Sequence, residues 1–204
     1  DGALSIARQQ VNSGAHGLDL CVALTERADE ADSMCRLVKI LSPVVRVPLV
    51  IDSTEPDVIE AALQNTPGRC LINSTNLESG PAKAERVFNL ARQYNAAVIA
   101  LTIDEGGMAK TAQRKLEVAM RIYQLAVNTF ALKPGDLVFD ALTFTLATGD
   151  PEFASSALDT LEGIRLIKRH RPGVVTSLGV SNVSFGLSPS ARAGLNSVRL
   201  YHGG

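Results

Sequence analysis

Residues 48–76 have the sequence PLVIDSTEPDVIEAALQNTPGRCLINSTN, which predicts a strand, a helix and a second strand. The runs 48–53 and 70–76 are apolar without regular polar alternation, as expected of parallel strands that are buried on both faces. Between them, residues 54–57 (TEPD) open a helix with a capping residue, a first-turn proline and first-turn acids. The segment therefore predicts one strand–helix–strand unit of a parallel sheet.

The same alternation extends over the whole chain. Four further apolar runs have the character of buried strands, and they lie at 16–22, 96–104, 136–142 and 174–182. A long helix near 109–130 is expected to stack Leu116, Met120, Tyr123, Val127 and Phe130 in its core-facing stripe. A later helix, opened by residues 150–152 (DPE), is expected to bury the face formed by Phe153, Ala157, Leu161 and Ile164.

Repeated strand–helix units within one domain, here residues 1–204, indicate either a doubly wound sheet or a (β/α)8 barrel. No strand is followed by G-x-G-x-x-G, so the dinucleotide-binding fingerprint is absent. The chain is expected to begin and end in a helix. The α/β fold predicted is thus a barrel of which six strands are present, with the first and the last strand outside this chain.

Composition excludes several classes of function. The formal net charge of −1 excludes a strongly basic nucleic-acid-binding surface, and no apolar run is long enough to span a membrane. The start of the chain does not resemble a signal peptide, and the three cysteines have no metal-binding spacing. We expect a cytoplasmic protein with buried, reduced thiols and neither nucleic-acid nor membrane partners.

Polar side chains stand at the predicted carboxyl end of nearly every strand. They are Asp19, Asp52, Asn73, Asp104, Glu105, Asp140 and Asn182. In a parallel barrel these ends meet at one mouth, which here would be anionic and rich in hydrogen-bond acceptors. Any one of them could simply cap a helix or anchor a loop. No strand end carries lysine, arginine or histidine, which argues against a phosphate site, a Schiff-base lysine and a histidine-rich metal centre.

Carboxylates and carboxamides suit a planar ligand that carries several N–H donors, such as a 2-amino-4-oxo pyrimidine ring. An ionised aspartate accepts two N–H bonds at once, and an asparagine can both donate and accept. The residues alone therefore favour a flat, nitrogen-rich heterocycle as the ligand and predict no bound metal.

Four segments carry a resemblance to a known family: VPLVIDSTEPDVIEAAL (47–63), INSTNLESG (72–80), LVFDALTFTLATG (137–149) and LGVSNVSFGL (178–187). Together they resemble the pterin-binding barrel of methyltetrahydrofolate methyltransferases. That family includes the folate domain of cobalamin-dependent methionine synthase and the methyltetrahydrofolate:corrinoid methyltransferases. The resemblance extends over nearly the whole chain and implies a barrel that holds the pterin at its carboxyl-terminal mouth.

The resemblance assigns roles to individual residues. It implies that Asp52, Asn73 and Asp140 hold the pterin ring and that Asn182 lies near N5, where the methyl group leaves. Asp19 matches an aspartate at the same mouth and is a candidate proton source, which makes Asn182 and Asp19 the implied catalytic pair. An arginine that follows the SN strand contacts folate in relatives. The nearest arginine here is Arg192, at a different spacing.

The implied activity moves a methyl group from methyltetrahydrofolate to the Co(I) of a corrinoid (cobalamin), carried by a partner domain or protein. A homodimer is left open. Three alternatives compete: dihydropteroate synthase, a folate-binding module without activity of its own, and an unrelated barrel enzyme whose rim acids are caps. Relatives of dihydropteroate synthase carry a lysine near the end of the strand at 178–182, whereas residues 179–185 contain none.

The chain departs from the relatives at its start and after Asp140. The first-strand motif of relatives is absent before Asp1, and Ala141 replaces a proline that relatives carry after Asp140, which alters the loop and leaves the carboxylate. Residues 104–110 (DEGGMAK) are expected to form a glycine-hinged loop over the mouth.

Overall fold

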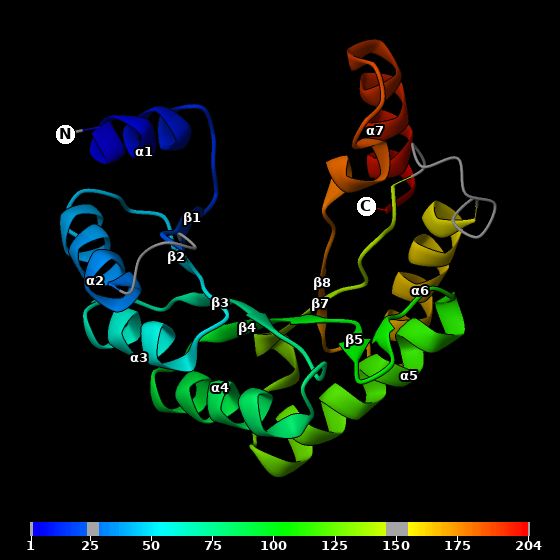
Figure 1. Cartoon of the computed structure of the whole chain (residues 1–204), viewed down its shortest axis with the longest axis horizontal. Helices are drawn as coiled ribbons and strands as arrows, with labels where there is room; N and C mark the ends of the chain where they lie inside the picture. The colour runs from blue at the N-terminus through cyan, green and yellow to red at the C-terminus, as the bar shows by residue number, and fades with distance from the viewer. Residues whose placement is uncertain (1, 24–28, 146–154, 204) are drawn as a thin grey trace.

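A computed structural model of the chain describes residues 2–23, 29–145 and 155–203, and its main feature is one curved parallel sheet (Figure 1). The sheet has six strands in the order β1-β2-β3-β4-β7-β8, and every neighbouring pair is parallel. The strands are β1 Leu18–Cys21, β2 Leu49–Asp52, β3 Leu71–Thr75, β4 Ala97–Leu101, β7 Leu137–Asp140 and β8 Val175–Ser177. Each lies within one of the six predicted apolar runs, which confirms those predictions.

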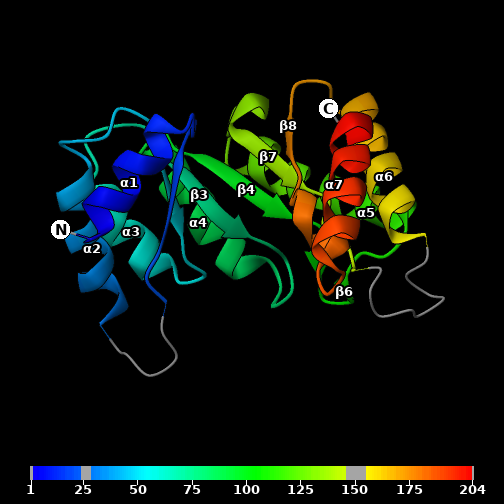
Figure 2. The same cartoon turned by 90° about the horizontal axis from the view of Figure 1, so that it is seen from above.

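The helices follow the outer side of the sheet, and the resulting arc is open between α1 and α7 (Figure 1). They are α1 Gly2–Asn12, α2 Glu30–Leu41, α3 Pro56–Gln64, α4 Pro81–Gln93, α5 Ala112–Tyr123, α6 Ser156–His170 and α7 Pro189–Gly203. The expected helices at both ends of the chain are thus present, and α7 lies beside α6 at the β8 end of the sheet (Figure 2).

The two faces of the sheet differ sharply in burial. In β1, Leu18 and Leu20 are buried whereas Asp19 and Cys21 are exposed, and β2, β4 and β7 alternate in the same way between buried and half-buried residues. The buried set joins helix residues in one hydrophobic core. Because successive side chains of a strand point to opposite faces, the polar strand-end residues share the inner face, away from the helices.

Three parts of the chain depart from the expectations. The last predicted strand ends at Ser177, and residues Val180–Ser184 form a short 3-10 helix instead. A hairpin of β5 Ile103–Asp104 and β6 Gly107–Met108 replaces the glycine-hinged loop. Cys70 is buried as predicted, but Cys35 is half-buried and Cys21 is exposed, because the side chain of Cys21 points to the inner face.

The long-helix prediction is confirmed in its packing. Leu116 is buried, and Met120, Tyr123, Val127 and Phe130 pack against the core from α5 and from the π-helical turn Gln124–Thr129 that follows it. The most buried face of α5 is a different one, formed by Lys115, Val118, Ala119 and Ile122.

The buried face of α6 is also displaced from the prediction. Ile164 is buried, whereas Ala157 and Leu161 are half-buried, and Ser156, Thr160, Gly163 and Ile167 complete the buried face. Residues 150–152, expected to open this helix, and Phe153, expected on its buried face, lie outside the described residues. Nowhere in the described ranges is a helix both long and apolar enough to cross a membrane.

Candidate functional site

Asp19, Asp52 and Asn73 come together on the inner face of three adjacent strands: Asp52 is the last residue of β2, Asn73 is in the middle of β3, and Asp19 is the second residue of β1. The register places Asp52 directly beside Asn73, and Cys21 beside Asp52. Nδ2 of Asn73 donates a hydrogen bond to Oδ2 of Asp19 over 3.5 Å. The structure therefore joins three of the predicted residues into one polar group.

This group is electrostatically crowded. Partial burial raises the pKa of the Asp19 carboxyl, the nearby Asp52 carboxylate raises it further, and the hydrogen bond from Asn73 acts in the opposite direction. Asp19 thus holds a proton more readily than an ordinary aspartate. A ligand that presents N–H donors would relieve the repulsion between the two carboxylates.

An apolar hollow of about 620 Å³ extends along the inner face from Asp19 and Asn73 toward the amino ends of the strands, and neither Asp52 nor Asp140 lines it. Val50, Leu71, Ala97, Ile99 and Val138 line it together with Asp19 and Asn73. Apolar walls beside a few polar groups are typical of small-molecule sites.

Asp140 lies farther along the sheet, at the end of β7 and separated from β3 by β4. It is in register with Leu101 of β4 and Ser177 of β8, and its Oδ1 accepts a hydrogen bond of 2.8 Å from the backbone N–H of Leu142. Burial raises the pKa of the Asp140 carboxyl, and this hydrogen bond and the positive charges of Arg199 and Lys115 oppose that rise.

Arg199 of α7 is a site residue that the sequence analysis missed. Its side chain is buried, and its Nε, Nη1 and Nη2 atoms have no hydrogen-bond partner within the described part of the chain. Asn196, three residues earlier on the same helix, accepts a 2.8 Å hydrogen bond from Ser184 of the 3-10 helix. That face of α7 is therefore turned toward the segment that carries Asn182. A lone arginine in a polar helix gives no sequence signal of burial.

Asn182 lies in the 3-10 helix Val180–Ser184, beyond the end of β8, and is exposed. Its amide is close to Gly179, but no contact joins it to Asp19, Asp52, Asn73 or Asp140 among the described residues. Arg192 is half-buried near the start of α7, and none of its described contacts reaches these residues either. The structure places both beside the β8 end of the sheet without assembling them with the others.

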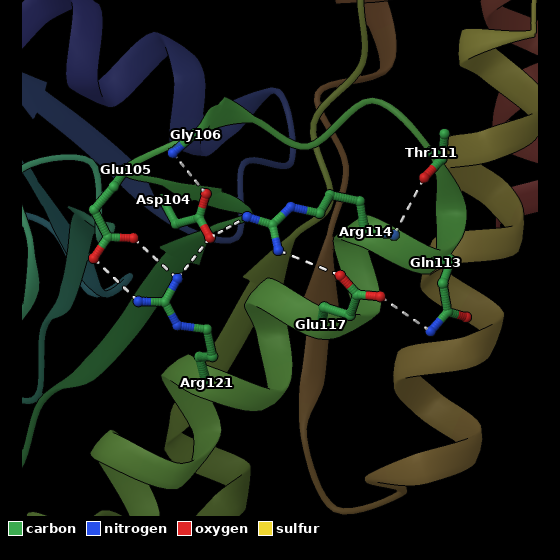
Figure 3. A network of polar contacts seen from close by, with 8 residues as sticks. All are labelled: Asp104, Glu105, Gly106, Thr111, Gln113, Arg114, Glu117 and Arg121. Atoms are coloured by element: carbon green, nitrogen blue, oxygen red, sulfur yellow. Dashed lines mark hydrogen bonds and ion pairs between the residues drawn. The ribbon is translucent and has the colours of Figure 1, made fainter.

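Asp104 and Glu105 do not belong to this group. Asp104 is buried in the hairpin, where its carboxylate pairs with Arg114 and, at 2.6 Å, with Arg121 of α5 (Figure 3). Glu105 accepts two hydrogen bonds from Arg121, at 3.0 and 3.1 Å. The expectation that both line the mouth is therefore wrong, because Arg114 and Arg121, two turns apart on one face of α5, hold this hairpin against the helix.

We expect Asp104→Ala to lower the free energy of unfolding by about 1–3 kcal/mol, because it removes a buried acceptor of charged hydrogen bonds. The loss stays below that of a fully buried ion pair because Arg114 and Arg121 are about half exposed and regain water. Denaturant unfolding measures it, with Glu162→Ala as control. Glu162 pairs with Arg165 on the surface at 3.6 Å, so its loss is worth at most a few tenths of a kcal/mol. Equal effects of the two variants would contradict the assignment.

No group of three or more histidine, cysteine, aspartate or glutamate side chains within the described ranges has the geometry to hold a metal ion. The arrangement offers acceptors for N–H groups along β1–β3, a carboxylate backed by two cations at β7, and an exposed carboxamide beyond β8.

The chain is similar to known pterin-binding proteins. A family model described as pterin binding enzyme matches residues 1–203. The methionine synthases of Mycobacterium leprae and Mycobacterium tuberculosis are each 44% identical to the chain over 201 residues, which is 97% of the chain and 17% of each relative. The chain thus spans about a sixth of the length of these curated relatives.

Solved structures of dihydropteroate synthases have a similar fold. The enzyme from Thermus thermophilus matches with a TM-score of 0.70 at 20% identity, covering 100% of this chain and 78% of that one. The enzyme from Vibrio fischeri matches with a TM-score of 0.70 at 16% identity, covering 99% and 74%. At such identities the likeness concerns the fold, and it confirms the predicted α/β barrel with part of its strands, of which this sheet forms an open arc similar to the barrel of dihydropteroate synthases.

Proposed function

The chain belongs to the pterin-binding enzyme family, and from this premise we propose that it binds methyltetrahydrofolate and transfers the N5-methyl group to the Co(I) of a corrinoid, as methionine synthases do. The observation that best supports the proposal is the joining of Asp19, Asp52 and Asn73 on the inner face of three adjacent strands. The 44% identity to methionine synthases favours this member of the family.

We propose that the side chains of Asp52, Asn73 and Asp140 bind the pterin ring. The ring presents N–H donors along one edge, and ionised carboxylates accept two such bonds at once. Holding the ring in one orientation aligns its N5-methyl group for attack, which is worth several kcal/mol of the barrier when the alignment is near that of reaction.

The difficult part of the reaction is the leaving group. The bond between N5 and the methyl carbon breaks with its electron pair remaining on nitrogen, so a proton at N5 is needed to avoid an amide-like anion. The acceptor, a corrinoid held by a separate domain or protein, supplies the electron pair that forms the new bond to the methyl carbon. Help from a general acid is typically worth ~10²–10⁴-fold.

Asn182 does not titrate near neutral pH, but its carboxamide can turn and hydrogen-bond N5 both before and after protonation. The raised pKa of Asp19 suits a group that donates a proton, directly or through water. We therefore assign Asn182 to the stabilisation of N5 and Asp19 to the supply of its proton, with Arg192 as a further candidate for contact with folate.

The test is single-turnover transfer by the whole natural protein, mixed with methyltetrahydrofolate and free cob(I)alamin and followed by the absorbance of the corrinoid. Methyl transfer supports the proposal. Binding without transfer would favour a folate-binding module instead. Condensation of p-aminobenzoate with a pterin pyrophosphate would favour dihydropteroate synthase, although no lysine stands at residues 179–185.

We expect Gly179→Ala to slow the transfer about 10-fold by displacing Asn182. Gly179 has an ordinary φ of −69°, but an added Cβ would lie 2.7 Å from Nδ2 of Asn182. The carboxamide is the end of a flexible side chain, so it turns away at little cost in stability. Gly194→Ala is the matched control, because an added Cβ there meets nothing within 4 Å. Unchanged transfer by the folded Gly179→Ala variant would contradict the role of Asn182.

A further inference from the structure

Lys115 is a fully buried lysine of α5 that the proposed reaction does not use. Its Nζ donates hydrogen bonds to three backbone carbonyls, those of Ala109 at 2.8 Å, Ala141 at 2.7 Å and Leu142 at 3.3 Å. An ammonium group has three N–H donors, so these acceptors satisfy it completely. Two of the three carbonyls belong to the residues that directly follow Asp140.

The backbone that Lys115 holds also sets the Asp140 carboxylate. Leu142 has a φ of 51°, a left-handed conformation that is unfavourable for a leucine and persists only where contacts enforce it. In that conformation its N–H donates to Oδ1 of Asp140. The carbonyl of Leu142 accepts from Lys115 and, at 2.7 Å, from the hydroxyl of Thr160. Lys115 and Thr160 therefore fix the residue that orients Asp140.

The fold makes room for Lys115 at one position of α6. A Cβ added to Gly163 would lie 2.9 Å from Cδ and 3.3 Å from Cβ of Lys115. The aliphatic part of the lysine therefore packs directly against the backbone of Gly163, where any side chain would collide with it. The helices α5 and α6 contact each other there.

The charges that face Lys115 come from three elements. Burial lowers its pKa to about 8, the carboxylates of Asp159 on α6 and Asp140 on β7 oppose that shift, and Arg199 on α7 adds to it. Replacing buried charged groups by apolar side chains of similar size is often neutral for the free energy of unfolding, so stability alone does not account for a lysine here. Its contacts instead converge on the turn behind Asp140.

We propose that Lys115 is a positioning residue of the pterin site, which holds residues 141–142 so that the Asp140 carboxylate faces the ring. This inference rests on the proposed function, because Asp140 has to be a ligand-binding group for the positioning to matter. Lys115 itself contacts no ligand.

The test is a double-mutant cycle in the whole natural protein, with methyltetrahydrofolate affinity measured by fluorescence titration. We expect Lys115→Met to weaken binding about 10-fold in the wild-type background and less than about twofold in the Asp140→Ala background. Non-additivity of this size shows that Lys115 acts through Asp140. Additive losses, or a folded Lys115→Met variant with wild-type affinity, would overturn the proposal.

A second variant keeps the test decisive if Lys115→Met does not fold. Gly163→Ala crowds the lysine and is expected to weaken binding several-fold, whereas Gly194→Ala gives a helix the same extra methyl group in open space and leaves binding unchanged. Equal binding by both variants would contradict the proposal.

A pH profile provides an independent readout. As the pH rises through about 8, the wild-type lysine loses one of the N–H groups that hold the three carbonyls, so affinity is expected to fall. Folded Lys115→Met lacks this component, and its persistence there would count against Lys115. If the wild-type protein binds no methyltetrahydrofolate at any pH, the proposed function fails. If the wild-type protein binds it and the Lys115 and Gly163 variants bind it equally well with the same pH profile, only the inference about Lys115 fails.

Discussion

Replacing Asn182 with alanine is expected to slow single-turnover methyl transfer by about 10²–10³-fold while changing methyltetrahydrofolate affinity by less than about threefold. The carboxamide stabilises nitrogen as its bond to the methyl carbon breaks, so it contributes mainly in the transition state. Binding depends instead on the ring contacts along β1–β3 and β7. Stopped-flow absorbance measures the transfer, and fluorescence titration measures the affinity.

Ser181→Ala is the matched control for this experiment. Ser181 is the neighbour of Asn182 in the same 3-10 helix, and the described contact that it makes is through its backbone carbonyl. We expect it to behave as wild type in both assays. Equal losses of transfer and affinity in Asn182→Ala would show that Asn182 stabilises the bound ligand and the transition state equally, and would contradict its role at N5.

Replacing Asp140 with alanine is expected to weaken methyltetrahydrofolate binding about 100-fold, in contrast to Asn182→Ala. The half-buried carboxylate is expected to accept two N–H bonds from the ring, and at the lower value of roughly 1.5 kcal/mol for each hydrogen bond to a charged group their loss corresponds to about 100-fold. The same interaction predicts a pH effect. Because burial raises the pKa of the Asp140 carboxyl, affinity is lost as the pH falls through that raised value.

Asp136→Ala is the control at the opposite end of β7. Asp136 pairs with Arg69, away from the carboxyl ends of the strands, so its loss should leave affinity unchanged. Asp140→Asn keeps the size of the side chain and removes its charge, and we expect an intermediate loss. Wild-type affinity in Asp140→Ala would remove β7 from the ligand site.

The strands could be predicted because the strands of a parallel sheet are largely apolar without regular polar alternation, as residues 48–53 and 70–76 show. Their carboxyl ends then follow from the order of the chain, and with them the meeting of Asp52 and Asn73. The 3-10 helix at Val180–Ser184 could not be predicted in this way, because its sequence continues the apolar run of β8.

Burial that depends on distant contacts was also beyond the sequence reasoning. The ion pairs of Asp104 depend on how the hairpin meets α5, and Arg199 is buried by the way α7 folds back on the β8 end. Lys115 did leave a signal. It begins an i, i+3, i+4, i+7 series with Val118, Ala119 and Ile122, so its position on the most apolar face of α5 predicts a buried charge with fixed partners.

The ends of the arc expose backbone. Within the described residues β1 pairs only with β2, and β8 only with β7, so the outer border of each offers unpaired N–H and C=O groups that a strand from another molecule can meet. A preparation limited to residues 1–204 would therefore tend to self-associate as its concentration rises. Affinities are better determined in dilute solution or in the whole natural protein, where intermolecular strand addition does not compete with ligand.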